Sequence, residues 1–339
     1  MTDRPREGAC CAPTLRHAAP AGSRTTAPGP GGAARPADPP AEPAAEPAAE
    51  PAAEQCRVPG GRFRMGDHHG DGDPADGEGP VHEVRVAPFT IDATAVTNAA
   101  FAAFVDATGH VTDAEAYGFS AVFHLALAAP PADVLGPFDG APWWLGVRGA
   151  SWRNPGGRRS GLDGLDDHPV VHVSWNDAVA YCAWSGRRLP TEAEWEFASR
   201  GGLPGARFPW GDDLAPDGTW RANIWQGDFP VRNTAEDGWV TTAPVRSYEP
   251  NRYGLWQTVG NVWEWCADWF DPAYYRTSPS ENPAGPDRGT ARVLRGGSYL
   301  CHDSYCNRYR NAARSSNTPD SSMGNAGFRT VAATHHKEP

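Results

Sequence analysis

The sequence predicts an α+β fold with little regular secondary structure. The 339-residue chain holds 38 Gly, 34 Pro and 14 Trp residues, and Gly and Pro interrupt helices and strands. Only three segments carry the residues that begin and end a helix. Two segments alternate apolar and polar residues as strands do. Because no internal repeat divides the chain, we expect these elements to share one core.

The first 55 residues differ in composition from the rest of the chain. They are dominated by Ala, Pro, Gly and Glu, and Pro-Ala-Ala-Glu recurs up to Glu54. Such a segment has almost no apolar surface to bury, so residues 1–55 are predicted to be a disordered, dispensable leader. Residues 56–339 then form a single domain. Cys10 and Cys11 are interpreted as incidental, although an adjacent thiol pair can bind Cu(I).

Charge and hydropathy exclude several partners. The formal net charge is −11 and the pI is 5.4, which argues against nucleic acid as the main partner. No apolar run approaches the ~20 residues of a membrane span, and the N-terminus has no apolar signal region. We therefore expect a cytoplasmic protein with reduced thiols, acting as a monomer without nucleic acid or membrane.

Two strands are predicted at the start of the core. Residues 57–66 form a strand that ends in a turn, and residues 81–91 alternate like a half-buried strand. The Asp/Gly/His-rich segment 67–79 between them has the residues of a metal site. Gly and Asp are also the usual turn residues, so a solvated hairpin loop is predicted there.

Capping residues predict three helices. A Ser, Thr or Asn side chain accepts a hydrogen bond from the first turn, and a glycine stops the last. The predicted helices are residues 98–108 between Thr97 and Gly109, a helix after Ser174 or Asn176 through Trp184 to Gly186, and a helix that opens on the capping box Thr191–Glu194 and ends before Gly201. From Gly202 onward we predict short strands and turns.

Two thiols lie five positions apart at Cys301 and Cys306, after the pair Gly296–Gly297. Such a pair can close a disulfide, contribute to a zinc site or hold Cu(I). Zinc needs two further ligands at paired spacings, which are absent, and a disulfide is disfavoured in the cytosol. A redox or soft-metal role and an inert pair both stay open. Cys182 and Cys266 are interpreted as small buried hydrophobes.

Glu264 is a carboxylate among tryptophans, in the segment 260–265. A buried carboxylate needs a cation or several donors, and Ca²⁺ with backbone carbonyls would provide one. Segments 223–226 and 234–239 offer a second set of oxygen ligands. The alternative is that these Asn and Asp residues only form turns.

Several motifs together resemble those of the formylglycine-generating enzymes, the sulfatase-modifying factor family. The shared signatures are His168-Pro-Val-Val-His-Val-Ser-Trp-Asn-Asp-Ala178, Arg188-Leu-Pro-Thr-Glu-Ala-Glu-Trp-Glu196, Ala222-Asn-Ile-Trp-Gln-Gly227, Gly260-Asn-Val-Trp-Glu-Trp265, Arg295-Gly-Gly-Ser298 and Gly327-Phe-Arg329. They cover residues 58–332, and much of them belongs to a wider superfamily. The thiol segment 298–310, followed by 313–322, is specific to the formylglycine-generating branch.

The resemblance implies the formylglycine-generating-enzyme fold, which is related to C-type-lectin-like folds. It implies a copper-dependent oxidase that uses O2 to convert the cysteine of a Cys-x-Pro-x-Arg segment, in an unfolded sulfatase polypeptide, to Cα-formylglycine. Cys301 and Cys306 would hold Cu(I). One structural Ca²⁺ would be bound by Asn223, Ile224, Asp237 and Trp239, and a second by Gln257, Gly260, Val262 and Glu264.

The resemblance also assigns roles around the thiols. Ser298, with Tyr299, would border the oxygen pocket. The residues that would position peptide or water are His302, Arg314 and Asn325, and those that would line the peptide groove are Ser120, Trp143 and Trp144.

The chain departs from the family pattern at several positions. Gln257 stands where Asn is common. Thr330 and Asn311 replace cysteines of secreted relatives, so Cys182 lacks a disulfide partner. Ala95 and Phe119 replace acidic residues that hold the substrate arginine in some relatives, which leaves that contact unassigned.

Two other functions share this scaffold. A lectin-like binding module would not need the thiol pair. A nonheme-iron sulfoxide synthase would need a separate helical domain with a His-rich iron site, for which the leader has no room.

Overall fold

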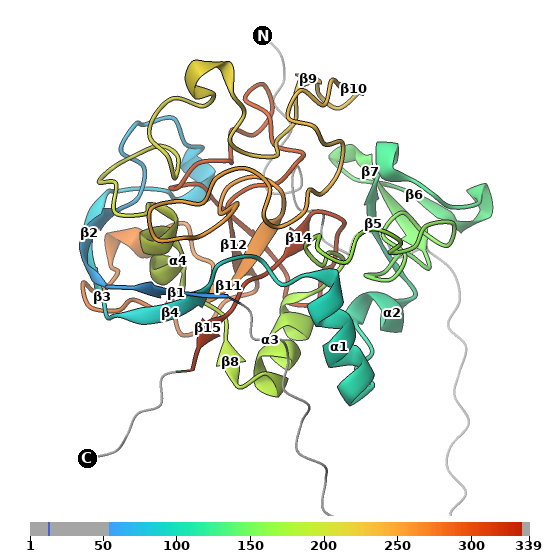
Figure 1. Cartoon of the computed structure of the whole chain (residues 1–339), viewed down its shortest axis with the longest axis horizontal. Coiled ribbons are helices and arrows are strands. Elements are labelled where there is room, and N and C mark those ends of the chain that lie inside the picture. The colour runs from blue at the N-terminus through green and yellow to red at the C-terminus, as the bar shows by residue number, and fades with distance from the viewer. Residues whose placement is uncertain (1–12, 14–53, 334–339) are drawn as a thin grey trace, which may run out of the picture.

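The computed structural model describes residue 13 and residues 54–333 (Figure 1). Short strands and helices are joined by long loops, so the predicted α+β class with little regular secondary structure is confirmed. The strands are β1 (Gln55–Val58), β2 (Gly61–Met65), β3 (His82–Val86), β4 (Phe89–Asp92), β5 (Phe119–Phe123), β6 (Val134–Phe138), β7 (Ala141–Arg148), β8 (Arg187–Arg188), β9 (Gly227–Asp228), β10 (Arg232–Asn233), β11 (Trp263–Trp269), β12 (Arg292–Arg295), β13 (Arg314–Asn317), β14 (Ala326–Gly327) and β15 (Val331–Ala332).

The strands form small sheets. Their orders are β1-β4-β15-β8, β13-β12-β11-β14, β5-β7-β6, β2-β3 and β10-β9. The sheet around β11 lies at the centre of the view in Figure 1 and leads into the thiol segment. Its only parallel pair is that of β11 with β14 within the described chain, so the C-terminal part of the chain closes back on the core.

Each of the two predicted strands is divided in two. Residues 57–66 break at Gly60, where φ is 67° and a Cβ would lie 2.6 Å from the Val86 carbonyl oxygen. The second breaks at Ala87, before Pro88. β2 pairs antiparallel with β3, so the segment between them is a hairpin loop as predicted. It is not simply solvated, because Asp76 and Glu78 within it are buried.

The three predicted helices are confirmed. They are α1 (Asn98–Thr108), α3 (Trp175–Trp184) and α4 (Glu192–Ser199), capped by Thr97, Ser174 and Thr191. Ser174 rather than Asn176 therefore caps α3. A short helix, α2 (Asp113–Tyr117), was not predicted, although Thr112 and Glu115 form its capping box.

The sheet β5-β7-β6 was also not predicted. It stands at the right of the view in Figure 1, and β7 pairs antiparallel with both neighbours. Irregular register between β6 and β7 interrupts the alternation that sequence analysis relies on. This sheet matters for the site because it carries Ser120, Trp143 and Trp144.

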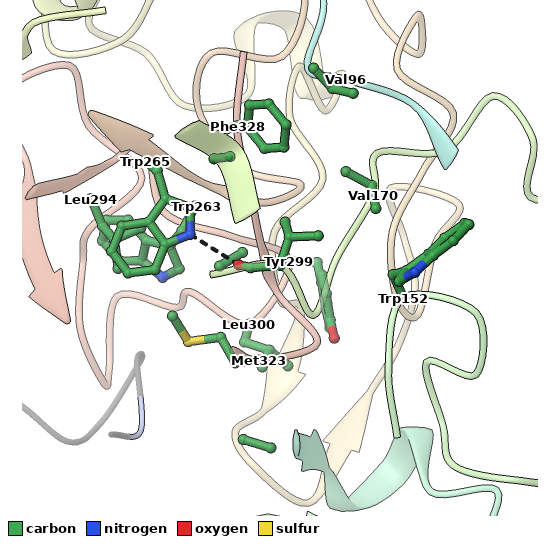
Figure 2. Close-up of a cluster of buried hydrophobic side chains, with 14 of the residues drawn as sticks. Val96, Trp152, Val170, Trp263, Trp265, Leu294, Tyr299, Leu300, Met323 and Phe328 are labelled. Atoms are coloured by element: carbon green, nitrogen blue, oxygen red, sulfur yellow. Dashed lines mark hydrogen bonds between the residues drawn. The ribbon is translucent and has the colours of Figure 1, made fainter. Parts of the chain in front are cut away.

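Tryptophan, tyrosine and phenylalanine fill the main core. Figure 2 shows Trp263, Trp265, Leu300 and Met323 packed in one cluster that also contains Cys301. The indole nitrogen of Trp265 donates to the Val173 carbonyl oxygen at 3.1 Å. One thiol of the candidate site is therefore part of the hydrophobic core.

Buried arginines tie distant segments together. Each pairs with a buried carboxylate, which offsets the cost of removing both charges from water. The pairs are Arg295 with Glu192 and Glu196, Arg200 with Glu196, Arg314 with Glu192, Arg308 with Asp76, Arg310 with Glu78, and Arg329 with Glu264. Four of these arginines flank the thiols in sequence, Arg295 before them and Arg308, Arg310 and Arg314 after them, so the network fixes both sides of that segment.

The boundary of the leader differs from the predicted one. Gln55 already begins β1, and the Glu54 carbonyl oxygen accepts a hydrogen bond from the Ala93 amide at 2.8 Å. Predictions for residues 1–12 and 14–53 lie outside the described residues. Pro13 is described, and it is buried. Within the described chain, no helix is long and apolar enough to cross a membrane.

Candidate active site

The thiol segment begins with a turn that requires glycine. Gly296 and Gly297 follow β12 with φ values of 92° and 72°. A Cβ at either position would lie 2.5 Å from a backbone carbonyl oxygen, that of Thr258 or Arg308. Only glycine tolerates both the backbone angle and the contact. The turn directs Ser298 and Cys301 into the core.

Short-range hydrogen bonds fold the segment into a compact loop. The Cys301 amide donates to the Ser298 carbonyl oxygen at 2.9 Å, and the Cys306 amide donates to the His302 carbonyl oxygen at 2.9 Å. Cys301 is buried, whereas Cys306 is partly exposed. The loop therefore holds one thiol inside the core and the other at its surface.

The two thiols share an environment. The Ser298 amide donates to Cys301 Sγ at 3.4 Å, so the backbone of the turn contacts the buried sulfur directly. Burial raises the pKa of Tyr309, and negative charge on Asp303, Cys301 and Cys306 raises it further.

The structure brings Ser298 and Asn325 together. Asn325 Nδ2 donates to Ser298 Oγ at 2.9 Å, and the Leu300 amide donates to the same oxygen at 3.3 Å. Because both groups donate to Ser298 Oγ, the hydroxyl proton itself can be donated to a third group beside Cys301. The interaction fixes the serine rotamer.

Tyr299 borders a cavity of about 200 Å³, lined also by Phe123, Trp152 and Gly324. Its hydroxyl donates to the Gly324 carbonyl oxygen at 3.0 Å, and burial raises its pKa. Ser298 does not line this cavity. A larger cavity of about 660 Å³ lies against β2 and α4, away from every candidate residue.

An aromatic group adjoins the thiol loop. The Trp143 ring is 5.0 Å from that of Tyr305 and 5.3 Å from that of Phe229, and Phe229 stacks on Tyr305 at 4.3 Å. Tyr305 directly precedes Cys306. Trp143, from β7, therefore packs against the residue that precedes the more exposed thiol.

Trp144 points to the opposite face of β7 because successive strand residues alternate. Its side chain is fully buried, and its ring lies 6.1 Å from that of Phe123. Trp144 cannot be exposed in a groove. It supports Trp143 from within the core.

Ser120 is also buried rather than groove-lining. Its Oγ lies 2.7 Å from Ser322 Oγ and 2.8 Å from His172 Nδ1. Burial lowers the pKa of His172 to about 4, so its ring is neutral at pH 7. The group holds the segment before Asn325 against β5.

The remaining two candidates differ in position. His302 is partly exposed on the thiol loop, with Nδ1 2.8 Å from Ser304 Oγ. Arg314 is fully buried and makes two bonds to Glu192, at 2.6 and 2.9 Å. The expectation that Arg314 positions peptide or water conflicts with this burial, because its guanidinium stabilises the core beneath the site.

Comparison with known proteins identifies the family. The family model described as "Sulfatase-modifying factor enzyme 1-like domain" matches residues 41–334 of the chain. A formylglycine-generating enzyme of Streptomyces coelicolor is 68% identical over 312 residues, which cover 92% of this chain and 95% of the relative. One from Thermomonospora curvata is 59% identical over 280 residues, covering 81% of this chain and 92% of the relative.

The chain belongs to the sulfatase-modifying factor family.

Family membership does not by itself establish activity. A relative from Mus musculus, named inactive Cα-formylglycine-generating enzyme 2, is 46% identical over 279 residues, covering 81% of this chain and 84% of the relative. Among solved structures, PvdO from Pseudomonas aeruginosa has a TM-score of 0.60 and 25% identity, covering 82% of this chain and 93% of that one. The geometry of the thiols must therefore carry the functional argument.

The thiol pair of this sulfatase-modifying factor fits Cu(I). A soft ion accepts two thiolates and needs no third ligand, and Cys301 is shielded from water. Within the described residues, no group of three or more His, Cys, Asp or Glu side chains is arranged to hold a metal ion. Cys301 and Cys306 are the donors that would hold copper.

Two unpaired oxygens fit the calcium sites. Among the described residues, Asn223 Oδ1 and Gln257 Oε1 are buried with no hydrogen-bond donor. Asn223 belongs to one of the two calcium sites that the family resemblance implies, and Gln257 belongs to the other. Burial raises the pKa of Asp237, an unfavourable desolvation that a bound cation would relieve. Gln257, the departure from the family pattern, thus still presents an oxygen.

The buried charge of Glu264 is satisfied by protein side chains rather than by the Ca²⁺ that sequence analysis considered. Its carboxylate accepts from Arg329 at 2.6 and 2.7 Å and from the Trp195 indole at 2.7 Å. These donors satisfy the buried charge, so the burial of Glu264 does not require calcium. Both Arg329 and Trp195 lie in the quoted signatures, but their spacing gave no sign of this pairing.

Tyr305 and Phe229 were not predicted as site residues. Tyr305 could have been suspected, because it lies between the two cysteines. Phe229 comes from the loop between β9 and β10 and has no local signal. Cys182 and Cys266, interpreted as buried hydrophobes, are free buried thiols. Thr330 bonds to Asp92 and Asn311 to Ser199, so both non-cysteine positions are part of the core.

Proposed function

We propose that this chain is a formylglycine-generating enzyme that oxidises the cysteine of a Cys-x-Pro-x-Arg segment in an unfolded sulfatase polypeptide. The observation that carries the proposal is the placement of Cys301 and Cys306 on one hydrogen-bonded loop. The Cys301 thiol is buried and the Cys306 thiol is partly exposed, and Trp143 packs on Tyr305, the residue before Cys306. The identity to formylglycine-generating enzymes supports the same reaction.

The reaction balances when a reductant is included. The substrate thiol on its methylene carbon, one O2, two electrons and two protons give the aldehyde, one hydrogen sulfide and one water. The C–S bond breaks and a C=O bond forms, with the aldehyde oxygen taken from water as sulfide leaves. The carbon gives up two electrons, and O2 takes up four electrons and is reduced to water. The two electrons must come from an external thiol. Bound Cu(I), held by Cys301 and Cys306, would supply the activation of O2 beside the substrate sulfur.

The residues of this chain have three tasks. The aromatic group of Trp143, Phe229 and Tyr305 would orient the peptide by its apolar atoms. Ser298 Oγ, fixed by Asn325, would donate its proton to oxygen or sulfur in the site. The burial of Cys301 excludes water from the inner side of the site, which protects a reactive centre from side reactions.

Calcium, location and assembly belong to the same proposal. Two structural Ca²⁺ ions would be held around Asn223 and Gln257, supported by their unpaired oxygens. A cytoplasmic location is supported by Cys182 and Cys266, which remain free buried thiols. The proposed partner is the sulfatase polypeptide, bound by a monomer without nucleic acid or membrane.

One experiment tests the proposal. The Cu(I)-loaded protein is incubated in air with a Cys-x-Pro-x-Arg peptide and a thiol reductant, and mass spectrometry measures conversion of thiol to aldehyde. A peptide with Ser in place of Cys is the control. If the cysteine peptide keeps its mass with fully loaded protein, the proposal is wrong.

A further inference from the structure

The cavity of about 660 Å³ is bordered by an edge of strand β2. β2 pairs with β3 on one side only, and it stands at the left margin of the view in Figure 1. The cavity is also lined by Phe197 of α4 and by Tyr253. Its volume is typical of ligand sites, and it lies apart from the thiols. The groups that β2 presents to it therefore indicate what it could bind.

The hydrogen bonds of β3 show which backbone groups of β2 turn outward. The Arg85 amide donates to the Ser280 carbonyl oxygen at 2.7 Å, and the Arg85 carbonyl oxygen accepts from the Asn282 amide at 2.8 Å. Arg85 thus uses both of its backbone groups on the side away from β2. Its register partner Arg62 must then be in a non-hydrogen-bonded pair, with its own amide and carbonyl turned away from β3.

Arg64 is turned outward in the same way, because the pairs of an antiparallel ladder alternate. Its carbonyl oxygen accordingly accepts from His68 Nε2 at 2.9 Å, outside the ladder. Among the described residues, none forms a hydrogen bond with the amide of Arg62 or Arg64, or with the Arg62 carbonyl oxygen. The edge therefore presents two donors and one acceptor, spread over about 7 Å of strand.

One face of this edge is aromatic. The Phe63 ring lies 5.2 Å from that of Phe197, which stacks on the Tyr253 ring at 6.0 Å. A Cβ on Gly61 would lie 3.9 Å from the Phe197 ring, so this face of β2 packs against α4. All four residues line the cavity. An apolar side chain that entered it would contact aromatic rings.

The opposite face is exposed and positively charged. Arg62 pairs with Glu83 at 2.5 Å, but both side chains are more than half exposed. No ion pair joins Arg64 to another residue of the described chain. Arg85, opposite Arg62 in the register, adds a third cation to the same face. An acidic side chain over this face would be attracted.

We propose that the edge of β2 adds a strand from the unfolded sulfatase polypeptide, taken from a segment outside Cys-x-Pro-x-Arg that alternates acidic and apolar residues. Its apolar side chains enter the cavity beside Phe63 and Tyr253, and its acidic side chains lie over Arg62 and Arg64. Its backbone pairs with the open groups of the edge. The inference rests on the proposed function for the source of this segment, because an unfolded polypeptide has backbone groups free to pair.

A second copy of the chain fits this edge poorly. Two β2 edges paired with each other would bring Arg62 and Arg64 of one copy against the same residues of the other. Like charges directly opposite each other destabilise a sheet. Charged side chains on an exposed edge are a common device against such self-association. The occupant must carry the opposite charge.

The first test uses modified peptides and unchanged, metal-free protein. Fluorescence anisotropy follows labelled Glu-Leu-Glu-Phe-Glu-Leu, and two versions carry N-methyl groups either on every Glu or on every apolar residue. The amides of alternate residues point to opposite edges of a strand, so only one methylated set can face β2. We expect one version to bind within about twofold of the parent peptide and the other at least tenfold more weakly. A version with Lys in place of Glu should not bind.

Variants of the protein separate the edge from its charge. Arg64→Pro removes one open donor and places a ring at the edge, while the β2–β3 ladder keeps its hydrogen bonds. It should weaken binding at least about fivefold. Arg64→Gln keeps the amide and should weaken binding about threefold. Arg85→Gln is the matched control, because Arg85 shares the charged face but does not line the cavity, and it should leave binding nearly unchanged.

A linked substrate tests the source of the segment. The probe sequence is joined before or after a Cys-x-Pro-x-Arg peptide by a Gly/Ser linker of about 30 residues, which can reach about 100 Å. Binding at both sites should lower KM at least about tenfold relative to the linked peptide with Lys in place of Glu. Arg64→Pro should cancel most of this gain.

The outcomes separate the two proposals. Equal binding of the two methylated peptides overturns the inference and leaves the proposed function standing, and it does so even if Arg64→Pro fails to fold. Equal KM for the two linked peptides overturns the assignment to the substrate polypeptide. So does a dimer, detected by analytical ultracentrifugation, that the probe peptide dissociates, because a second copy would then occupy the edge. Absence of conversion of the unlinked Cys-x-Pro-x-Arg peptide contradicts the proposed function instead.

Discussion

Replacing Glu196 by Gln tests the buried charge network beneath the thiols. Glu196 is fully buried, and its carboxylate accepts from Arg200 at 2.8 and 3.0 Å, from Arg295 at 2.6 Å and from the Gly66 amide at 2.9 Å. Gln keeps the shape but removes the negative charge between two buried cations. Arg295 keeps Glu192 as a partner, whereas Arg200 forms its ion pair within the described part of the chain with Glu196 and would lose it.

The loss of stability expected for Glu196→Gln follows from this arrangement. Removing one partner of a buried pair costs about 3–5 kcal/mol in the free energy of unfolding. At about 2–3 °C per kcal/mol for a domain of this size, Tm should fall by about 6–15 °C. Glu83→Gln is the matched control, because Glu83 pairs with Arg62 on the surface, where both side chains are more than half exposed. It should cost below about 1 kcal/mol.

The pH dependence gives a second, independent check. Burial alone would raise the pKa of Glu196, but the charges of Arg200 and Arg295 outweigh burial and hold it below the ordinary 4.5. A lowered pKa in the folded state adds stability that is present above pH 4.5 and is lost as pH falls through the folded pKa. The difference between native protein and Glu196→Gln should therefore shrink below pH 4.5.

Urea unfolding of the metal-free proteins at pH 7 and at steps down to pH 3 measures both effects. Thiol titration with a disulfide reagent under native conditions should also show faster reaction of Cys301 in Glu196→Gln, because Arg295 precedes the glycine turn. A loss below 1 kcal/mol at pH 7, or a difference that stays constant across this pH range, would refute the reasoning.

Three further predictions address the metals and the groove. Cys301→Ala and Cys306→Ala should each abolish turnover of the peptide with little change in Tm, since a two-thiolate site has no spare ligand; near-normal turnover of either variant contradicts the copper proposal. Exhaustive calcium chelation, verified by metal analysis, should lower Tm by mass action, and Asn223→Ala should reduce that shift; an unchanged Tm removes the calcium proposal. Trp143→Ala should raise KM for the peptide several-fold with a smaller effect on kcat, whereas Trp143→Phe should keep KM close to the native value. An unchanged KM in Trp143→Ala would show that the peptide binds elsewhere.

The helices were predictable because their signals are local. A capping side chain lies three residues before the backbone amide that donates to it, so Thr97, Ser174 and Thr191 could be identified without knowing the rest of the fold. The missed helix α2 carries the same capping box, but its five residues are too few to show a periodic pattern. The sheet β5-β7-β6 was missed because β5 is buried along nearly its whole length and the register between β6 and β7 is irregular, so neither shows a clear alternation.

The candidate site was predictable in part. The spacing of Cys301 and Cys306, and the glycine pair before them, determined that two thiols share one turn. The sequence did not show which residues from other segments surround that turn. Trp143 and Trp144 are adjacent in sequence, yet the pleat of β7 places one against Tyr305 and Phe229 and the other in the core.

The sequence by itself determined the loop-rich fold class, the helix ends and the thiol pair, because each depends on residues a few positions apart. Only the tertiary structure decided that Glu264 is satisfied by Arg329, that Arg314 belongs to the core, and that Asn317 holds Pro13. These partners are tens to hundreds of residues apart. A buried charge or carbonyl must find some donor, but the sequence does not state which one. The folded chain makes that choice when distant segments exclude water together.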